Sequence, residues 1–130
     1  MTILGLRTDK PEAELYLYED NKPLAEIKWQ AHLKLAETLN TKIQEILNKS
    51  SISYQDLDGI AAFKGPGSFT GLRIGLSVAN ALAYAQGIPI VSRGGKAWLR
   101  ECTAALKSGQ NEKIAVPEYG APARTTQPRK

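Results

Sequence analysis

The chain has 130 residues, enough for one domain with its own core, and 42% of them are hydrophobic, as in ordinary globular proteins. No window reaches the roughly 18 consecutive apolar residues of a membrane-spanning helix, and the N-terminus lacks a secretory signal pattern. The single cysteine, Cys102, excludes an internal disulfide and a multi-cysteine metal site, and we expect it to be a half-buried helix residue. We therefore expect a cytoplasmic protein. The net charge of +4 lies mostly in residues 107–130, which hold five basic and two acidic residues.

The first third of the chain is typical of an antiparallel sheet. Residues 2–6 form a short apolar run, and residues 13–19 alternate between hydrophobic and polar side chains, which predicts a strand with two different faces. Asp20 and Asn21 favour a hairpin turn, followed by a returning strand over residues 23–29.

The following segment predicts a helix, a buried strand and a second helix. Hydrophobic residues at helical spacing indicate a first helix over residues 32–49; they are Leu35, Leu39, Ile43, Ile46 and Leu47. Residues 57–64 predict a strand parallel to the first one, because the strand lies between two helices. The second helix, over residues 70–86, is apolar on two faces; one holds Leu72, Gly75, Leu76, Ala79 and Ala83, and the other holds Ile74, Val78, Ala81 and Ala85. A helix packed on one sheet needs only one apolar face, so the second face predicts a further contact.

The glycine-rich stretch between this strand and this helix is the best candidate for function. Gly65, Pro66, Gly67, Gly71 and Gly75 are expected to form a tight structural turn against the helix start. The turn matches neither a P-loop nor G-x-G-x-x-G, so phosphate binding is only a weak hypothesis, with Gly65, Gly67, Ser68 and Asp9 as its candidate residues. The lone His32 has no partner motif, and we expect no catalytic set, no cofactor and no metal site.

A last strand over residues 88–91 and a third helix over residues 97–106 complete the predicted elements, and residues 114–116 have the composition of a short edge strand. The order predicts an α/β fold: a five-stranded mixed sheet with three helices in a single domain. This plan matches the ribonuclease H-like fold of the actin and sugar-kinase superfamily. We place that domain at residues 1–106 and a basic, extended or partly disordered tail at residues 107–130.

The stretch from Gly65 to Gly75 also resembles the signature of the TsaB family, which takes part in tRNA threonylcarbamoyladenosine biosynthesis. Residues 56–60, 81–84 and 87–90 are similar to the family as well. The resemblance implies a non-catalytic scaffold that pairs with its catalytic paralogue TsaD. TsaD, working with the ATPase TsaE, modifies adenosine 37 of ANN-decoding tRNAs.

The same resemblance implies a partner surface on the first two helices and a homodimer when the chain is isolated. Its expected residues are Leu35, Leu39, Ile43, Ile46, Thr70, Arg73, Ile74, Val78, Ala81 and Ala85. Two departures stand out. Arg7 replaces the acidic residue at the end of the family's first strand, and the chain has room for only the first of the two domains typical of the family. Two alternatives stay open: a small nucleotide-dependent hydrolase or glycopeptidase-like peptidase, and an RNA-binding module that acts through the basic tail.

Overall fold

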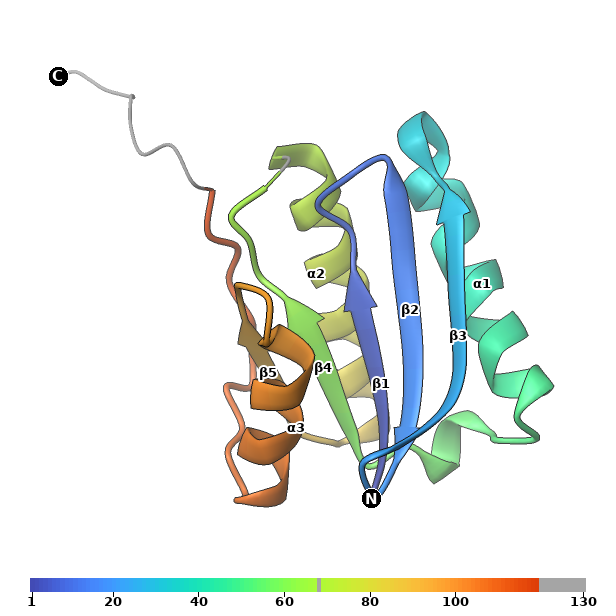
Figure 1. The fold of residues 1–130 in the computed structure, drawn as a ribbon, viewed down its shortest axis with the longest axis vertical. Helices are drawn as coiled ribbons and strands as arrows, with labels where there is room; N and C mark the ends of the chain where they lie inside the picture. The colour runs from blue at the N-terminus through green and yellow to red at the C-terminus, as the bar shows by residue number, and fades with distance from the viewer. Residues whose placement is uncertain (68, 120–130) are drawn as a thin grey trace, which may run out of the picture.

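The computed structural model describes residues 1–67 and 69–119. Its main elements are β1 (Thr2–Arg7), β2 (Glu12–Glu19), β3 (Lys22–Gln30), α1 (Leu35–Lys49), β4 (Gly59–Phe63), α2 (Phe69–Gln86), β5 (Ile90–Arg93) and α3 (Trp98–Lys107). Short 3-10 turns at His32–Lys34 and Tyr54–Asp56 precede α1 and β4. These are the strands and helices that the sequence predicts, with boundaries that differ by a few residues (Figure 1).

The strands form one mixed sheet in the order β3-β2-β1-β4-β5. The pairs β1–β2 and β2–β3 are antiparallel and the pair β1–β4 is parallel, as predicted. The pair β4–β5 is also parallel. At the β2–β3 hairpin, Asp20 and Asn21 have φ angles of 49° and 72°. Aspartate and asparagine tolerate this left-handed region better than most residues, which is why this pair makes the turn.

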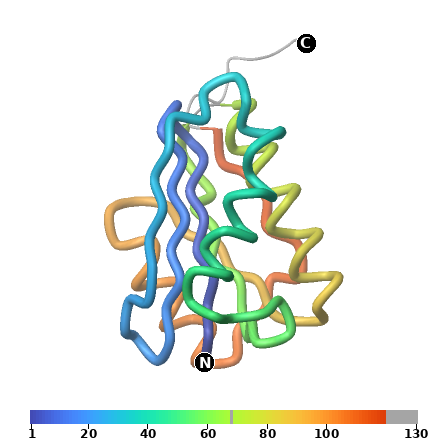
Figure 2. Tube along the Cα trace, turned by 90° about the vertical axis from the view of Figure 1, so that its right-hand side faces the viewer, coloured from blue at the N-terminus to red at the C-terminus, as the bar shows by residue number. Residues whose placement is uncertain are grey.

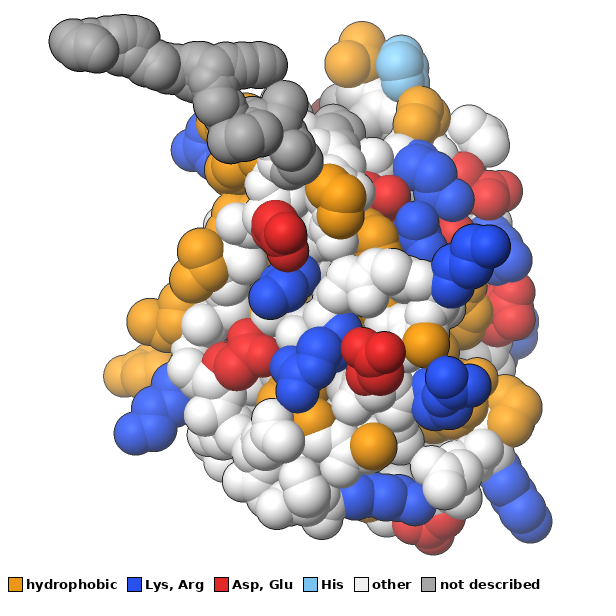
Figure 3. All heavy atoms as spheres, turned by 60° about the vertical axis from the view of Figure 1, so that its left-hand side comes forward, with side chains coloured by type: hydrophobic (Ala, Val, Ile, Leu, Met, Phe, Trp, Pro, Cys, Tyr) orange, Lys and Arg blue, Asp and Glu red, His pale blue; other side chains and the backbone are white. Residues whose placement is uncertain are grey.

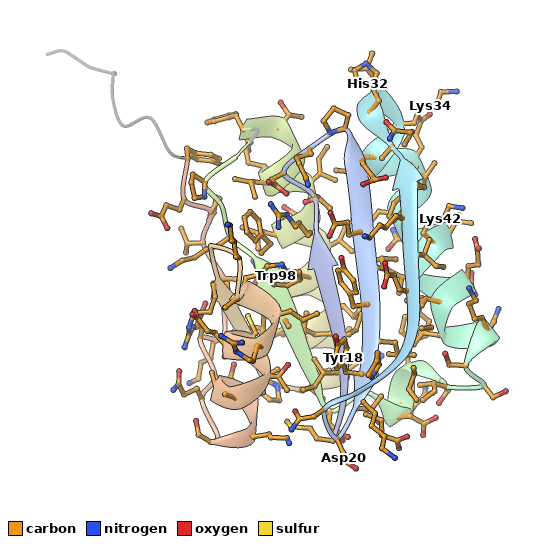
Figure 4. The ribbon with its side chains drawn as sticks, in the orientation of Figure 1. Tyr18, Asp20, His32, Lys34, Lys42 and Trp98 are labelled. Carbon is orange, nitrogen blue, oxygen red and sulfur yellow. The ribbon has the colours of Figure 1, made fainter. Side chains whose placement is uncertain are left out.

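The sheet is covered unequally on its two faces. Helices α1 and α2 pack on one face and α3 on the other (Figure 2). The larger core lies under α1 and α2, and the smaller one, which includes Phe63 and Trp98, lies under α3. The two tryptophans are divided in the same way. The Trp29 indole N–H donates to Thr38 Oγ1 of α1 at 3.0 Å. Trp98, the first residue of α3, lies on the other face and packs edge-on against Tyr16 and Phe63 (Figure 4).

Between the end of α3 and residue 119, the chain forms no helix or strand. We call residues 110–119 the strap; it runs beside β5 toward the turn at Gly65 (Figure 1). The expected edge strand at residues 114–116 is not formed, although Ala115 is buried. The rest of the predicted tail, residues 120–130, lies outside the described residues. Among the helices that the structure describes, none combines the length and the hydrophobicity needed to cross a bilayer.

Candidate functional site

The glycine turn is held by contacts that leave no room for a side chain. Gly65 has a φ of 117°, and a Cβ atom placed on it would lie 2.1 Å from the carbonyl oxygen of Glu118. A Cβ on Gly94 would lie 2.1 Å from the carbonyl oxygen of Gly65. Only glycine fits these positions, because real Cβ atoms do not approach other atoms so closely and because side chains disfavour this φ.

The same close packing joins the turn and α2 to the end of β1. A Cβ on Gly67 would lie 2.4 Å from Cβ of Asp9, and a Cβ on Gly75 would lie 2.0 Å from Oγ1 of Thr8. The Thr8 hydroxyl donates a hydrogen bond of 2.8 Å to the carbonyl oxygen of Gly71. These glycines therefore let the β1–β2 turn lie directly on the start of α2, which supports the structural role that we predicted for the turn.

Asp9, a weak phosphate-binding candidate, is engaged inside the protein. Arg7 Nε donates to Asp9 Oδ1 at 2.8 Å, and Arg7 Nη2 donates to Asp9 Oδ2 at 3.2 Å. The Arg7 guanidinium also lies 3.9 Å above the ring of Phe63. The hydrogen bonds from Arg7 to Asp9 raise the pKa of Arg7 further, so its guanidinium stays protonated. Both Asp9 carboxylate oxygens thus accept bonds from Arg7, the residue that departs from the family pattern.

The other candidate residues differ widely in exposure. Ser68 lies outside the described residues, and His32 is exposed at one end of the molecule (Figure 4). Cys102 is fully buried rather than half-buried, and this burial raises the pKa of its thiol to about 12. Among residues 1–67 and 69–119, no group of three or more histidine, cysteine or acidic side chains is placed to hold a metal ion.

A partly apolar groove lies between α1 and α2. One hollow is lined by Ala36, Phe69, Thr70, Arg73, Ile74, Ser77 and Val78. A second is lined by Asn40, Ile43, Tyr54, Ser77, Val78, Ala81 and Leu82, and the two share Ser77 and Val78. A third, at the N-terminal end of α1, includes Leu33, Thr70 and Ile74. We call these joined hollows the groove.

The groove contains only part of the predicted partner surface. The predicted residues of α2 are exposed or half-buried there or nearby: Thr70, Arg73, Ile74, Val78, Ala81 and Ala85. The predicted residues of α1 are instead buried in the core: Leu35, Leu39, Ile43 and Ile46, none of them more than 5% exposed. These four belong to the core cluster, and only Leu35 and Ile43 also reach the floor of the hollows. Periodicity showed that α1 has an apolar face, and the fold uses that face internally.

Several groove residues were missed from the sequence. Phe69 is 55% exposed and Leu33 is 87% exposed at the rim, although both are large hydrophobic residues. The Phe69 ring stacks on Tyr119 with ring centroids 4.3 Å apart, and the Arg73 guanidinium lies 5.4 Å from the Phe69 ring centroid. The sequence signal was available, since Phe69 is a large hydrophobic residue between Gly67 and Gly71 of the glycine turn.

Comparisons with known proteins place these elements in a family. The family model described as TsaD, tRNA N6-adenosine threonylcarbamoyltransferase, matches residues 29–92. The tRNA threonylcarbamoyladenosine biosynthesis protein TsaB of Bacillus subtilis is 35% identical over 69% of this chain and 39% of its own length. The TsaB protein of Haemophilus influenzae is 28% identical over 89% of this chain and 49% of its own length. The chain belongs to the TsaB family.

The similarity of the chain to TsaD proteins extends over fewer residues than its similarity to TsaB proteins. The tRNA N6-adenosine threonylcarbamoyltransferase of Geotalea uraniireducens is 46% identical, but over 50% of this chain and 18% of its own length. The chain spans no more than half the length of the curated relatives cited here. In this TsaB-family chain, the stretch matched by the TsaD family model contains α1, β4, the glycine turn and α2, and therefore both walls of the groove.

Solved structures agree with the assignment. YeaZ from Pseudomonas aeruginosa superimposes with a TM-score of 0.69 at 26% identity, covering 83% of this TsaB-family chain and 50% of that protein. RuvC of Thermus thermophilus, at 12% identity and a TM-score of 0.53, shares the fold. These neighbours confirm the predicted ribonuclease H-like fold.

Proposed function

We propose that the chain acts in tRNA threonylcarbamoyladenosine biosynthesis as a binding subunit whose groove receives TsaD. The observation that carries this proposal is the exposed apolar surface between α1 and α2, with Phe69 at its rim. A contiguous apolar surface on a small domain is typical of a protein interface. The TsaD family model matches residues 29–92 of this TsaB-family chain, so a contact between like helices of the two proteins fits their shared architecture.

In this proposal the chain is an accessory protein, not an enzyme. Its contribution is to bind TsaD; TsaE and the tRNA associate through the assembled complex. The same groove accounts for a homodimer of the isolated chain, because two copies can cover each other's apolar helices. TsaD and a second copy then compete for the same surface.

The side of the molecule that carries α3, β5 and the strap does not have the charge distribution of a nucleic-acid-binding surface. Acidic and basic side chains are mixed there, without a patch of one sign (Figure 3). A nucleic-acid surface normally shows clustered lysines and arginines. This face therefore gives the RNA-binding alternative no support, and residues 120–130 of the basic tail lie outside the described residues.

Two matched alanine-to-arginine substitutions test whether the groove is the surface that binds TsaD. Ala81 lies on α2 in the groove and Ala104 on α3 across the sheet, and both are exposed helix residues. In Ala81→Arg, a charged side chain must be desolvated in the contact, so we expect co-purification with TsaD to be lost and affinity measured by calorimetry to fall at least about tenfold. Val78→Arg should behave in the same way.

Ala104→Arg makes the same chemical change on the opposite face and should leave binding intact. Equal binding of TsaD by the wild type, Ala81→Arg and Val78→Arg would contradict the groove as the contact surface. Circular dichroism of each variant establishes that the fold is retained.

A further inference from the structure

The strap closes the outer edge of β5, the last strand of the sheet. The Ile90 N–H donates to Asn111 Oδ1 at 3.1 Å, the Ile90 carbonyl accepts from the Glu112 N–H at 2.8 Å, and the Ser92 N–H donates to Glu112 Oε2 at 2.9 Å. These main-chain groups are the ones that a sixth strand would pair with. The strap therefore takes the place of an edge strand, partly by means of side chains.

Glu112 provides several of these contacts. Besides the Ser92 N–H, its carboxylate accepts from the Ser92 hydroxyl at 2.7 Å and from Arg93 Nη1 at 3.2 Å. Arg93 also donates to the Gln110 side chain at 3.0 Å. Removing the Glu112 carboxylate would leave the Ser92 N–H without its acceptor at this end of the strap.

The middle of the strap is bound to α2 by one side chain. Asn80 Oδ1 accepts from the Ala115 N–H at 2.8 Å, and Asn80 Nδ2 donates to the Ala115 carbonyl at 3.0 Å. The Asn80 amide thus pairs with Ala115 as a neighbouring strand would. Ala115 is 2% exposed, whereas Ile114 and Val116 on either side are 68% and 65% exposed.

The far end of the strap lies on the glycine turn and the rim of the groove. The Glu118 N–H donates to the Lys64 carbonyl at 2.7 Å, and the Glu118 carbonyl fills the space that a side chain on Gly65 would need. The next residue, Tyr119, stacks on Phe69. The strap is thus in contact with the β5 edge at one end and with Phe69 at the other.

We propose that the strap is a releasable latch that links the β5 edge to the rim of the groove. When docked, it holds the glycine turn and Phe69 in place for a partner; when released, both loosen and the partner binds more weakly. The consequence for TsaD rests on the proposed function, whereas the link between the two ends of the strap is a property of this chain alone.

The contacts explain why the strap can open without unfolding the domain. Among the described residues, two main-chain to main-chain hydrogen bonds join the strap to the sheet and the glycine turn, through Glu112 and Glu118; its other hydrogen bonds to β5 and α2 pass through side chains. Segments with few buried apolar contacts and few backbone bonds open at low free-energy cost. Ala115 is the one buried hydrophobic residue in the described part of the strap.

Residue-resolved amide hydrogen exchange on the full chain tests the latch. In Glu112→Ala we expect exchange at Ser92 to rise about 5- to 30-fold, the ratio that corresponds to the loss of one or two hydrogen bonds. Because the strap opens as a unit, exchange at Glu118 should rise by a similar factor, although Glu118 lies at the other end. Core amides such as Ile60 should stay protected, and Glu101→Ala, which removes an exposed carboxylate from α3, should change none of these rates.

Two results would overturn the latch: faster exchange at Ser92 with unchanged exchange at Glu118, or no change at either amide. If Glu112→Ala also exposes the core amides, Asn80→Ala decides instead, because it releases the strap from α2 and should raise exchange at Ala115 and Glu118 together.

The affinity for TsaD tests the second part of the proposal, that release of the strap weakens binding of the partner. In the double variant Asn80→Ala/Glu112→Ala the strap should be mostly released, and the affinity for TsaD should fall about tenfold, in proportion to the docked fraction that remains. Unchanged affinity with a released strap would refute the role at the rim. If the wild type does not bind TsaD at all, the proposed function fails, but the exchange at Glu118 still decides whether the latch exists.

Discussion

Replacing Gly75 with alanine sets two effects of opposite sign against each other. Alanine is favoured over glycine in a helix interior by about 1 kcal/mol, so helix propensity alone predicts stabilisation. The new Cβ atom, however, would lie 2.0 Å from Oγ1 of Thr8 and 3.0 Å from both Cβ and Cγ2 of the same residue. Rotating the hydroxyl group away does not relieve the clash, because all three heavy atoms of the Thr8 side chain are close.

The overlap therefore has to be relieved by moving the β1–β2 turn away from α2. Overpacking of this kind costs about 1–3 kcal/mol. It also weakens the hydrogen bond of 2.8 Å from the Thr8 hydroxyl to Gly71. Adding about 1 kcal/mol for the weakened hydrogen bond and subtracting the gain in helix propensity, we expect Gly75→Ala to lower the free energy of unfolding by about 1–3 kcal/mol.

Urea unfolding followed by circular dichroism measures this difference. Ser77→Ala, at an exposed position of the same helix, is the matched control and should be neutral or slightly stabilising. In Gly75→Ala/Thr8→Ala much of the clash is gone, so the double variant should be more stable than the sum of the single losses predicts, by about 1 kcal/mol. The reasoning is refuted if Gly75→Ala is as stable as the wild type, or if the two losses simply add.

Two further predictions concern ionisable groups. Because burial raises the pKa of Cys102 to about 12, alkylation by iodoacetamide at pH 8 should be about a hundredfold or more slower in the folded chain than in denaturant; similar rates in both would contradict its burial. Hydrogen bonds from the backbone N–H and the hydroxyl of Ser53 lower the pKa of Asp56, so its contribution to stability is present above the ordinary carboxyl pKa and is lost as the pH falls through the lowered value. Asp56→Ala should thus be less stable than the wild type at pH 7 and equally stable in strong acid, and a difference that persists in acid would argue against a stabilising role of these hydrogen bonds from Ser53 to Asp56.

The order of the elements could be predicted because local patterns determine it. Alternation in β2, helical spacing in α1 and the Asp20-Asn21 turn each depend on neighbouring residues, and the structure contains all three. The parallel pairing of β1 and β4 followed from the helix between β3 and β4, which carries the chain back to the other end of the sheet.

The parts that could not be predicted depend on contacts between distant residues. Helical spacing showed that Ile43 belongs to an apolar face, but not that the sheet already covers it. The strap gave no periodic signal, because its contacts use polar side chains such as Asn80 and Glu112 to bind main-chain groups. The glycines of the turn were recognised from their pattern, whereas Thr8, which makes Gly75 necessary, is a common residue with no signal of its own.

The division of the two tryptophans between the layers gives the protein a built-in pair of spectroscopic reporters. Trp29, hydrogen-bonded to α1, senses the layer that includes the groove, and Trp98, the buried first residue of α3, senses the layer on the far side. Single Trp→Phe variants would therefore yield two chains, each with emission from one layer. A partner can be titrated into each of these two variants while the fluorescence is recorded. The variant whose emission changes shows which face of the sheet the partner binds, and no residue of the binding surface has to be altered.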